Sequence, residues 1–364
     1  MPAVLDVLPS LYRGLLPAFF SRQVPAETKA DCGRCSMCAA HCGEAIEPVD
    51  GVSRLFRPDT KCCTFHPRLP NYLVGAILGD SSPGLAEGRG RVLAKIDRRV
   101  GLGPQWLRPP AVFSLLYSSS RRFFGRASSL RCPYFDQSSG GCAIWSWRES
   151  VCSTFFCQHV AGADGHAFWM SLKRWLALTE IQLSRWALLQ LHPDFVLEGQ
   201  DREDPANGPL SAEDLDERPL PENDYRKLWG AWAGPEASFY EACFKEVSAL
   251  SSADLARMLG LDGTIELAAL ERRHSAATAG RLPRTLRFNP SATVKWLRGG
   301  SVALGAYSEY EALALPGAAY HLLVAFDGTE PVDAVRQRLR RAHAADLDES
   351  VLLALYQQRV LVEP

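Results

Sequence analysis

Cysteine is the residue type whose number and spacing in this chain point most directly to chemistry. Ten of the eleven cysteines lie within positions 32–157, where they form three groups. The groups are a C-x2-C-x2-C-x3-C run, a vicinal pair and a more widely spaced set: Cys32, Cys35, Cys38 and Cys42; Cys62 and Cys63; Cys132, Cys142, Cys152 and Cys157. Packing alone gives no reason for such repeated short spacings, so we interpret these ten thiols as metal or cluster ligands.

Two kinds of centre fit these spacings. Bacterial ferredoxins use the same run to wrap an iron–sulfur cluster, with the fourth cysteine reaching a second cluster. Their trailing proline is absent here, where Gly43 follows the run. Zinc uses C-x2-C pairs equally well, because it needs four tetrahedral ligands and has no redox requirement. The residues leave the choice between iron–sulfur and zinc open.

The number of clustered thiols predicts two centres, most simply two [4Fe–4S] clusters. Eight thiolates would satisfy two four-ligand centres, whereas one centre would leave six of the ten clustered thiols without a role. Vicinal cysteines point in different directions, so at most one of Cys62 and Cys63 should serve a given metal. The spacing does not say which cysteines share a centre.

Other candidate ligands have more ordinary interpretations. Cys243 has no cysteine neighbour in sequence and falls in a helical pattern, so we expect it to be a small buried residue. His41, His66 and His159 follow cysteines closely. We expect these three to support the ligands or lie at the surface rather than bind metal.

Composition narrows the classes of partner. The 364 residues are 47% apolar, enough for two or three domains, and 40 Lys and Arg face 41 Asp and Glu. No overall field therefore draws the protein to nucleic acid or to an anionic membrane. The apolar N-terminus is interrupted by Asp6, Arg13 and Arg22, which argues against a signal peptide or a membrane span. We expect a cytoplasmic protein, in which disulfides are disfavoured.

The cysteine pattern resembles the YkgJ-type cysteine-cluster family over about residues 30–160. The early CGRCSMC and the vicinal CC correspond to its first group, although here Cys42 is displaced and the vicinal pair lies further along the chain. The later group, GGCAIWSWRESVCSTFFC, keeps the residues typical of the family: Gly141, Cys142, Ile144, Trp145, Arg148, Cys152, Phe155 or Phe156, and Cys157.

This resemblance implies a zinc- or iron-binding site, or an iron–sulfur site, without fixing a reaction. One branch that is similar to this family, the flagellin lysine methylases, is thought to combine an iron–sulfur cluster with S-adenosylmethionine. The substrate-binding parts of those enzymes are not recognisable here.

Downstream of the cysteines, apolar residues recur at steps of three and four and predict a long amphipathic helix. Its inner face would be Trp169, Leu172, Leu176, Thr179, Leu183 and Trp186. We expect this helix to cover the metal module and to shield it from water. His166 is expected at the helix start, and Glu180 is expected to be an exposed helix carboxylate.

These patterns predict an α+β, mostly helical fold in four parts. Residues 1–192 form a loop-rich, metal-stabilised cysteine domain with its covering helix, and residues 193–224 an acidic, proline-rich linker or exposed loop. Residues 225–280 should be helical and pack back on the first domain. Ser252 or Asp254 are expected to cap a helix there, and Gly260 and Gly263 to break it.

The last part, residues 281–364, changes character. Alternating residues around Gly299 and Gly300 predict a hairpin, followed by three short helices and a final strand. Asp327 and Gly328 should close the first of these helices, and Asp348 should cap the third.

The stretches FDGTEPVDAV and LLALYQQRVLV in this part resemble the PqqD-like peptide-recognition domain, a small winged-helix-type fold, over about residues 284–364. The resemblance implies a peptide or protein partner. From Arg287 onward, eight Lys and Arg face nine Asp and Glu, which argues against DNA binding.

A basic stretch, SSSRRFFGRASSLRCPYF, lies directly before Cys132. Its four arginines could neutralise thiolate-ligated clusters, dock an acidic redox partner, or form an ordinary solvated loop. Single-stranded nucleic acid is a further reading of arginine mixed with aromatic residues.

Together the observations favour an iron–sulfur or related metal-binding protein with two cysteine-ligated centres, acting in electron transfer or in redox modification of a peptide or protein partner. The alternatives are a structural zinc protein and an S-adenosylmethionine-dependent protein methylase. No catalytic base or nucleophile stands out.

Overall fold

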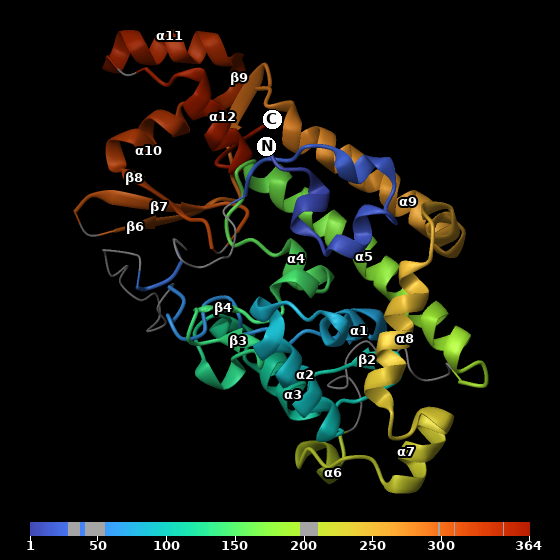
Figure 1. Ribbon diagram of the computed structural model, residues 1–364. Coiled ribbons are helices and arrows are strands. Elements are labelled where there is room, and N and C mark those ends of the chain that lie inside the picture. Colours follow the sequence, from blue (N-terminus) through green and yellow to red (C-terminus); the bar gives the residue numbers. More distant parts are fainter. Residues whose placement is uncertain (28–36, 41–54, 197–209, 298, 309, 345) are drawn as a thin grey trace.

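A computed structural model describes residues 1–27, 37–40, 55–196, 210–297, 299–308, 310–344 and 346–364. The fold is α+β and mostly helical, with small antiparallel sheets, as the sequence predicts (Figure 1). Among these residues, no helix has the length and apolarity to cross a bilayer.

The longest helix, α5 (Gly162–Leu191), runs through the larger part of the molecule (Figure 1). The predicted apolar face is largely buried, because residues three and four apart share one side of a helix. Helices α8 (Glu236–Ser248) and α9 (Ser252–Ala279) pack along it, which confirms that the segment after residue 225 folds back on this helix.

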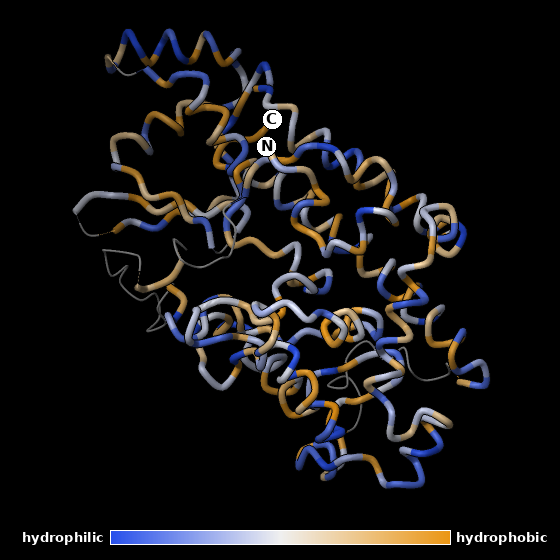
Figure 2. The backbone as a smooth tube through the Cα atoms, viewed as in Figure 1, coloured by the Kyte–Doolittle hydropathy of each residue, from blue (hydrophilic) through white to orange (hydrophobic). Residues whose placement is uncertain are grey.

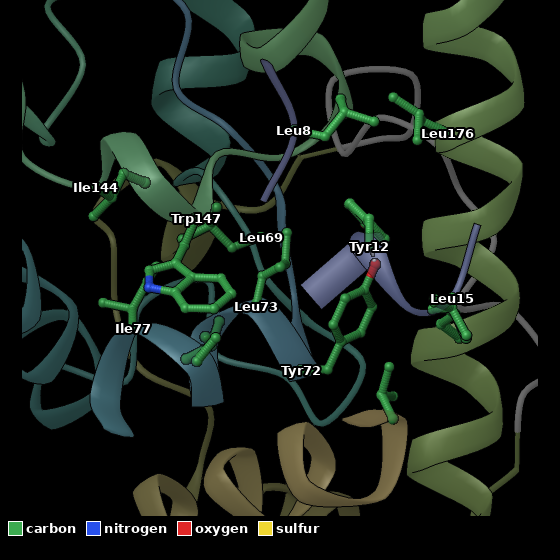
Figure 3. Packing of buried hydrophobic residues seen from close by; sticks show 14 of the residues in the cluster. Leu8, Tyr12, Leu15, Leu69, Tyr72, Leu73, Ile77, Ile144, Trp147 and Leu176 are labelled. Carbon is green, nitrogen blue, oxygen red and sulfur yellow. Dashed lines mark hydrogen bonds between the residues drawn. The ribbon is translucent and has the colours of Figure 1, made fainter. Parts of the chain in front are cut away.

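Helix α1 (Asn71–Gly79) packs tightly against α8. A Cβ atom at Gly75 would overlap the backbone carbonyl of Tyr240, so this close approach requires glycine. The N-terminal segment adds three short 3-10 turns, η1 (Val4–Val7), η2 (Ser10–Arg13) and η3 (Ala18–Ser21). Figure 3 shows Tyr12 of η2 beside Tyr72 of α1, and their hydroxyls lie 2.7 Å apart.

The cysteine-bearing part consists of short elements joined by loops. Its helices are α2 (Ala86–Asp97), α3 (Ala111–Ser119) and α4 (Ser150–Thr154), with 3-10 turns η4 (Pro83–Leu85), η5 (Arg121–Phe123), η6 (Ser128–Leu130) and η7 (Trp145–Trp147). Two antiparallel ladders pair β1 (Leu69–Pro70) with β2 (Trp106–Leu107) and β3 (Phe135–Asp136) with β4 (Gly141–Cys142). Most of the region is therefore held by side chains rather than by long ladders.

Helical structure returns earlier than residue 225. Residues 197–209 of the expected linker lie outside the described residues, but α6 (Ala212–Leu215), α7 (Glu222–Trp229) and η9 (Gly230–Trp232) follow. The cap of α9 is Ser251, not Ser252 or Asp254, and Asp254 bonds back to it in a capping box. Gly260 has non-helical dihedral angles, φ 55° and ψ −141°, and interrupts α9 as expected, whereas Gly263 lies within the helix that follows it.

The C-terminal part holds two three-stranded sheets and three helices. One sheet has the order β10-β5-β9 and the other β6-β7-β8. Their strands are β5 (Thr285–Phe288), β6 (Thr293–Trp296), β7 (Ser301–Gly305), β8 (Leu313–Pro316), β9 (Asp327–Pro331) and β10 (Leu361–Val362). The pairing of β6 with β7 confirms the predicted hairpin.

The helices of this part are α10 (Gly317–Val324), α11 (Val332–His343) and α12 (Glu349–Gln357), and Asp348 caps α12 through Val351 N at 2.9 Å as predicted. Asp327 does not close a helix: it begins β9, three residues after α10 ends. Figure 2 shows hydrophobic residues interspersed on a largely hydrophilic α11, in keeping with its buried Val332, Val335 and Leu339.

Residues 282–361 have a hydrophobic cluster of their own, and this part also contacts α5. Arg359 bonds to Asp164 of α5 at 2.7 Å. Gly162, the first residue of α5, has φ +53°, and a Cβ there would overlap the carbonyl of Gln357. The contact therefore depends on glycine at the start of the long helix.

Candidate metal centre

Five cysteines from separate segments line one cavity of about 490 Å³: Cys62, Cys63, Cys132, Cys142 and Cys152. The first two come from a loop before β1, and the others come from the loop before β3, from β4 and from α4. Residues 70–90 positions apart in sequence thus meet around one space.

Local hydrogen bonds explain how the loops hold the thiols in place. The backbone N–H of Cys132 donates to the carbonyl of Cys63 at 2.8 Å, which ties the second cysteine group to the third. Gly125 N donates to Thr64 Oγ1 at 2.6 Å, and Thr60 Oγ1 donates to Gly125 O at 3.1 Å. These threonines fix the chain on both sides of Cys62 and Cys63.

Glu149 positions the last thiol of the cavity. Its carboxylate caps α4 by accepting from Val151 N at 2.6 Å and from Cys152 N at 2.9 Å. Arg148 donates to the carbonyl of Cys152 at 3.0 Å, and its guanidinium lies 3.4 Å from the centre of the Trp145 ring. Helix α4 is only five residues long, so the Glu149 cap at its start and the Arg148 hydrogen bond to the Cys152 carbonyl together hold its conformation.

The vicinal cysteines face different neighbours, as their geometry requires. Cys63 and Cys142 both pack against the large hydrophobic cluster, which contains Cys132. Cys62 packs against a smaller cluster around Cys38, Phe56 and Phe124, which Cys157 also contacts. The two thiols therefore lie on the boundary between two groups of cysteines.

The other candidates are placed as follows. Cys243 is fully buried in α8, as expected. His66 is buried, and its Nε2 lies 2.9 Å from Lys95 Nζ. His159 is buried beside His166, and its Nδ1 has no partner among the described residues. Cys32, Cys35, His41 and Cys42 lie outside the described residues.

No disulfide joins any two of the described cysteines. Within the described residues, no group of three or more His, Cys, Asp or Glu side chains is arranged to hold one metal ion. A tetrahedral zinc ion with bonds of about 2.3 Å needs sulfur atoms about 3.8 Å apart. Five of the described thiols line one cavity.

Positively charged side chains line the cavity and would balance the negative charge of thiolates there. These side chains are Arg121, Arg148 and Lys173. The acidic lining residue, Glu149, accepts the hydrogen bonds that cap α4. Burial lowers the pKa of Arg148, while the thiolates of Cys152 and Cys142 oppose that shift. These positive groups favour the deprotonated sulfur that a metal requires.

The thiols themselves are held protonated by burial. Desolvation raises the pKa of Cys132 to about 12 and the pKa of Cys152 well above its ordinary value. For Cys63, the hydrogen bond with Cys62 lowers the pKa, but burial and the neighbouring thiolates outweigh it and the pKa is raised. Metal binding must therefore displace these protons, which makes it depend on pH.

Two buried carboxylates lie behind the cavity. Glu180 is only 4% exposed, so the expectation of an exposed helix carboxylate is wrong. Its oxygens accept from Ser150 N at 2.6 Å and from Ser150 Oγ at 2.7 Å. Burial and the nearby charge of Glu149 raise the pKa of Glu180 well above its ordinary value. The sequence signal was available in part, because Glu180 stands next to the apolar face at Thr179 and Leu183.

The C-terminal part also reaches the cavity. Tyr310, from the loop between β7 and β8, lines it and stacks edge-on with Phe56 at 5.8 Å and with Phe155 at 6.3 Å. Sequence reasoning missed Tyr310, because nothing local links it to cysteines far upstream.

Comparisons with protein-family models, with curated proteins and with solved structures found no match to this chain.

Proposed function

We propose that this protein binds an iron–sulfur cluster in the five-cysteine cavity and acts in electron transfer or in redox modification of a peptide or protein partner. The observation that supports the proposal is the gathering of five thiols from separate segments around about 490 Å³, with no disulfide among the described cysteines. A bound cluster would supply reversible one-electron chemistry.

Four of the five thiols form the preferred ligand set: Cys63, Cys132, Cys142 and Cys152. Cys63 and Cys142 pack against the hydrophobic cluster that includes Cys132, and the charges of Cys132, Cys142 and Cys152 act on the Cys63 thiol. Cys62 then belongs with Cys38 and Cys157. The proposal therefore keeps a second centre, to which Cys38, Cys62 and Cys157 would contribute.

The residues around the cavity suit such a centre. Arg148 and Lys173 neutralise negative charge, and the rings of Phe65, Phe124 and Tyr310 limit access of water. Exposure and hydrogen bonding around sulfur set the reduction potential of a cluster. We infer that the C-terminal part, which carries Tyr310 and resembles a winged-helix peptide-recognition domain, brings a peptide or protein partner close to this centre.

Structural zinc is the second candidate. It is less favoured because the described thiols surround a cavity and are not grouped around one ion. The methylase reading depends on the family resemblance, and binding of S-adenosylmethionine to the purified protein would test it. An absence of binding would remove it.

The decisive experiment is analysis of iron, acid-labile sulfide and zinc in anaerobically purified protein. We expect iron and sulfide in near-equal amounts and a brown colour. Cys132→Ser should lose most of the cluster assigned to its cavity. Cys243→Ser is the matched control, because Cys243 is also buried but lies away from the cavity, and it should keep the metal content. One zinc per four thiolates without sulfide would contradict the proposal.

A further inference from the structure

An exposed patch lies at the C-terminal end of α3, where two leucines and two arginines are close in sequence. Leu115 and Leu116 are 41% and 42% exposed, and Arg121 and Arg122 of η5 are also exposed. We call these four residues the α3 patch. Exposed apolar side chains beside cations are typical of surfaces that bind another protein.

The stretch of chain that carries the α3 patch is basic, although the acidic α6 packs against α3. Residues 98–135 contain seven arginines and no aspartate or glutamate. Arg98 and Arg99 pair with Glu217 and Glu222, but Arg121 and Arg122 form no ion pair within the described part of the chain. The two arginines of the patch therefore carry positive charge that no described carboxylate pairs with, and this charge would attract an acidic surface.

The α3 patch adjoins the cysteine cavity, which one of its four residues, Arg121, lines. Arg121 and Tyr117, the latter in the last turn of α3, line the cavity together with Cys62 and Cys152. A protein that docks on the patch would thus contact a residue that lines the thiol cavity.

We propose that the α3 patch docks a small acidic redox protein, with Arg121 and Arg122 steering it and Leu115 and Leu116 forming the contact. This inference rests on the proposed function, because it names the partner of the same centre. Arginine at the end of a helix also favours the helix dipole, but that role would not require two exposed leucines beside it.

The test uses a plant-type [2Fe–2S] ferredoxin as an acidic probe. Its binding is measured by titration calorimetry at low and high salt, about 0.02 M and about 0.5 M, because screening weakens steering by exposed charges. The charge-reversal variant is Arg121→Glu with Arg122→Glu. The control reverses Arg272 and Arg273, another adjacent exposed pair, on α9. Figure 1 shows α9 well away from α3.

We expect binding at low salt that is lost at high salt and weakened at least about tenfold by the α3 variant only. Binding that is insensitive to salt, absent, or equally weakened by both variants would overturn the docking proposal. The calorimetric result does not depend on the metal content, so it is separable from the proposed function. Where iron and sulfide are present, reduced ferredoxin should transfer electrons more slowly to Arg122→Glu alone, which leaves the cavity lining unchanged, while methyl viologen should reduce that variant at the wild-type rate.

Discussion

Gly162 offers a quantitative test of how the C-terminal part is held against α5. The residue has φ +53°, and a Cβ would overlap the carbonyl of Gln357. For Gly162→Ala, the left-handed backbone costs about 1–2 kcal/mol and the overlap about 1–3 kcal/mol more. We therefore expect Gly162→Ala to destabilise the packing of the C-terminal part against α5 by about 2–5 kcal/mol.

Gly280 provides a matched control. It has nearly the same backbone, φ +52°, but a Cβ there meets nothing within 4 Å. Gly280→Ala should cost only the backbone term of about 1–2 kcal/mol. The difference between the two variants isolates the overlap with Gln357.

The loss should be local, because residues 282–361 have their own hydrophobic cluster. The Arg359–Asp164 pair is partly exposed, with side chains 35% and 19% accessible, so it contributes at most about 1 kcal/mol and cannot hold the contact alone. Gly162→Ala should withdraw Tyr310 from the cavity and expose the thiols.

The assay combines two measurements on both variants. Denaturant unfolding followed by circular dichroism gives the global free energy, and the rate of thiol alkylation under native conditions reports access to the cavity. We expect faster alkylation in Gly162→Ala and little change in Gly280→Ala. Equal alkylation rates and equal stabilities in the two variants would refute the packing of Gln357 against Gly162.

Three further predictions concern stability. The folded pKa of Glu180 is raised above 4.5, so the wild type loses stability as pH rises above that value. In denaturant titrations, the free energy of unfolding of Glu180→Gln should therefore increase relative to that of the wild type between about pH 5 and pH 8. A difference between the two proteins that does not change with pH would contradict this. Gly75→Ala should lower the thermal midpoint strongly, since the new Cβ meets the backbone of Tyr240, which cannot rotate away. Asp348→Ala removes the bond to Val351 N and should cost about 0.5–2 kcal/mol in denaturant unfolding of the C-terminal part, whereas no change would show that water replaces the cap.

Local features were predictable because they depend on neighbours in sequence. The face of α5 follows from the spacing of its apolar residues, the β6–β7 hairpin follows from Gly299 and Gly300, and the cap of α12 follows from Asp348. Gly260 interrupts α9, as a glycine at that position predicts. Gly263 was expected to break the helix as well but remains helical, and its carbonyl accepts a hydrogen bond from Trp175 of α5, so packing along α5 outweighs its low helix propensity.

The sequence by itself determined which residues are candidate metal ligands, because ten cysteines cluster at short spacings. It also determined most helices, whose hydrogen bonds close within a few residues. Only the tertiary structure decided which cysteines share one cavity, that Glu180 is buried and that Tyr310 lines the cavity. Each of these depends on segments far apart in the chain, whose meeting is set by the packing of the whole core rather than by local spacing.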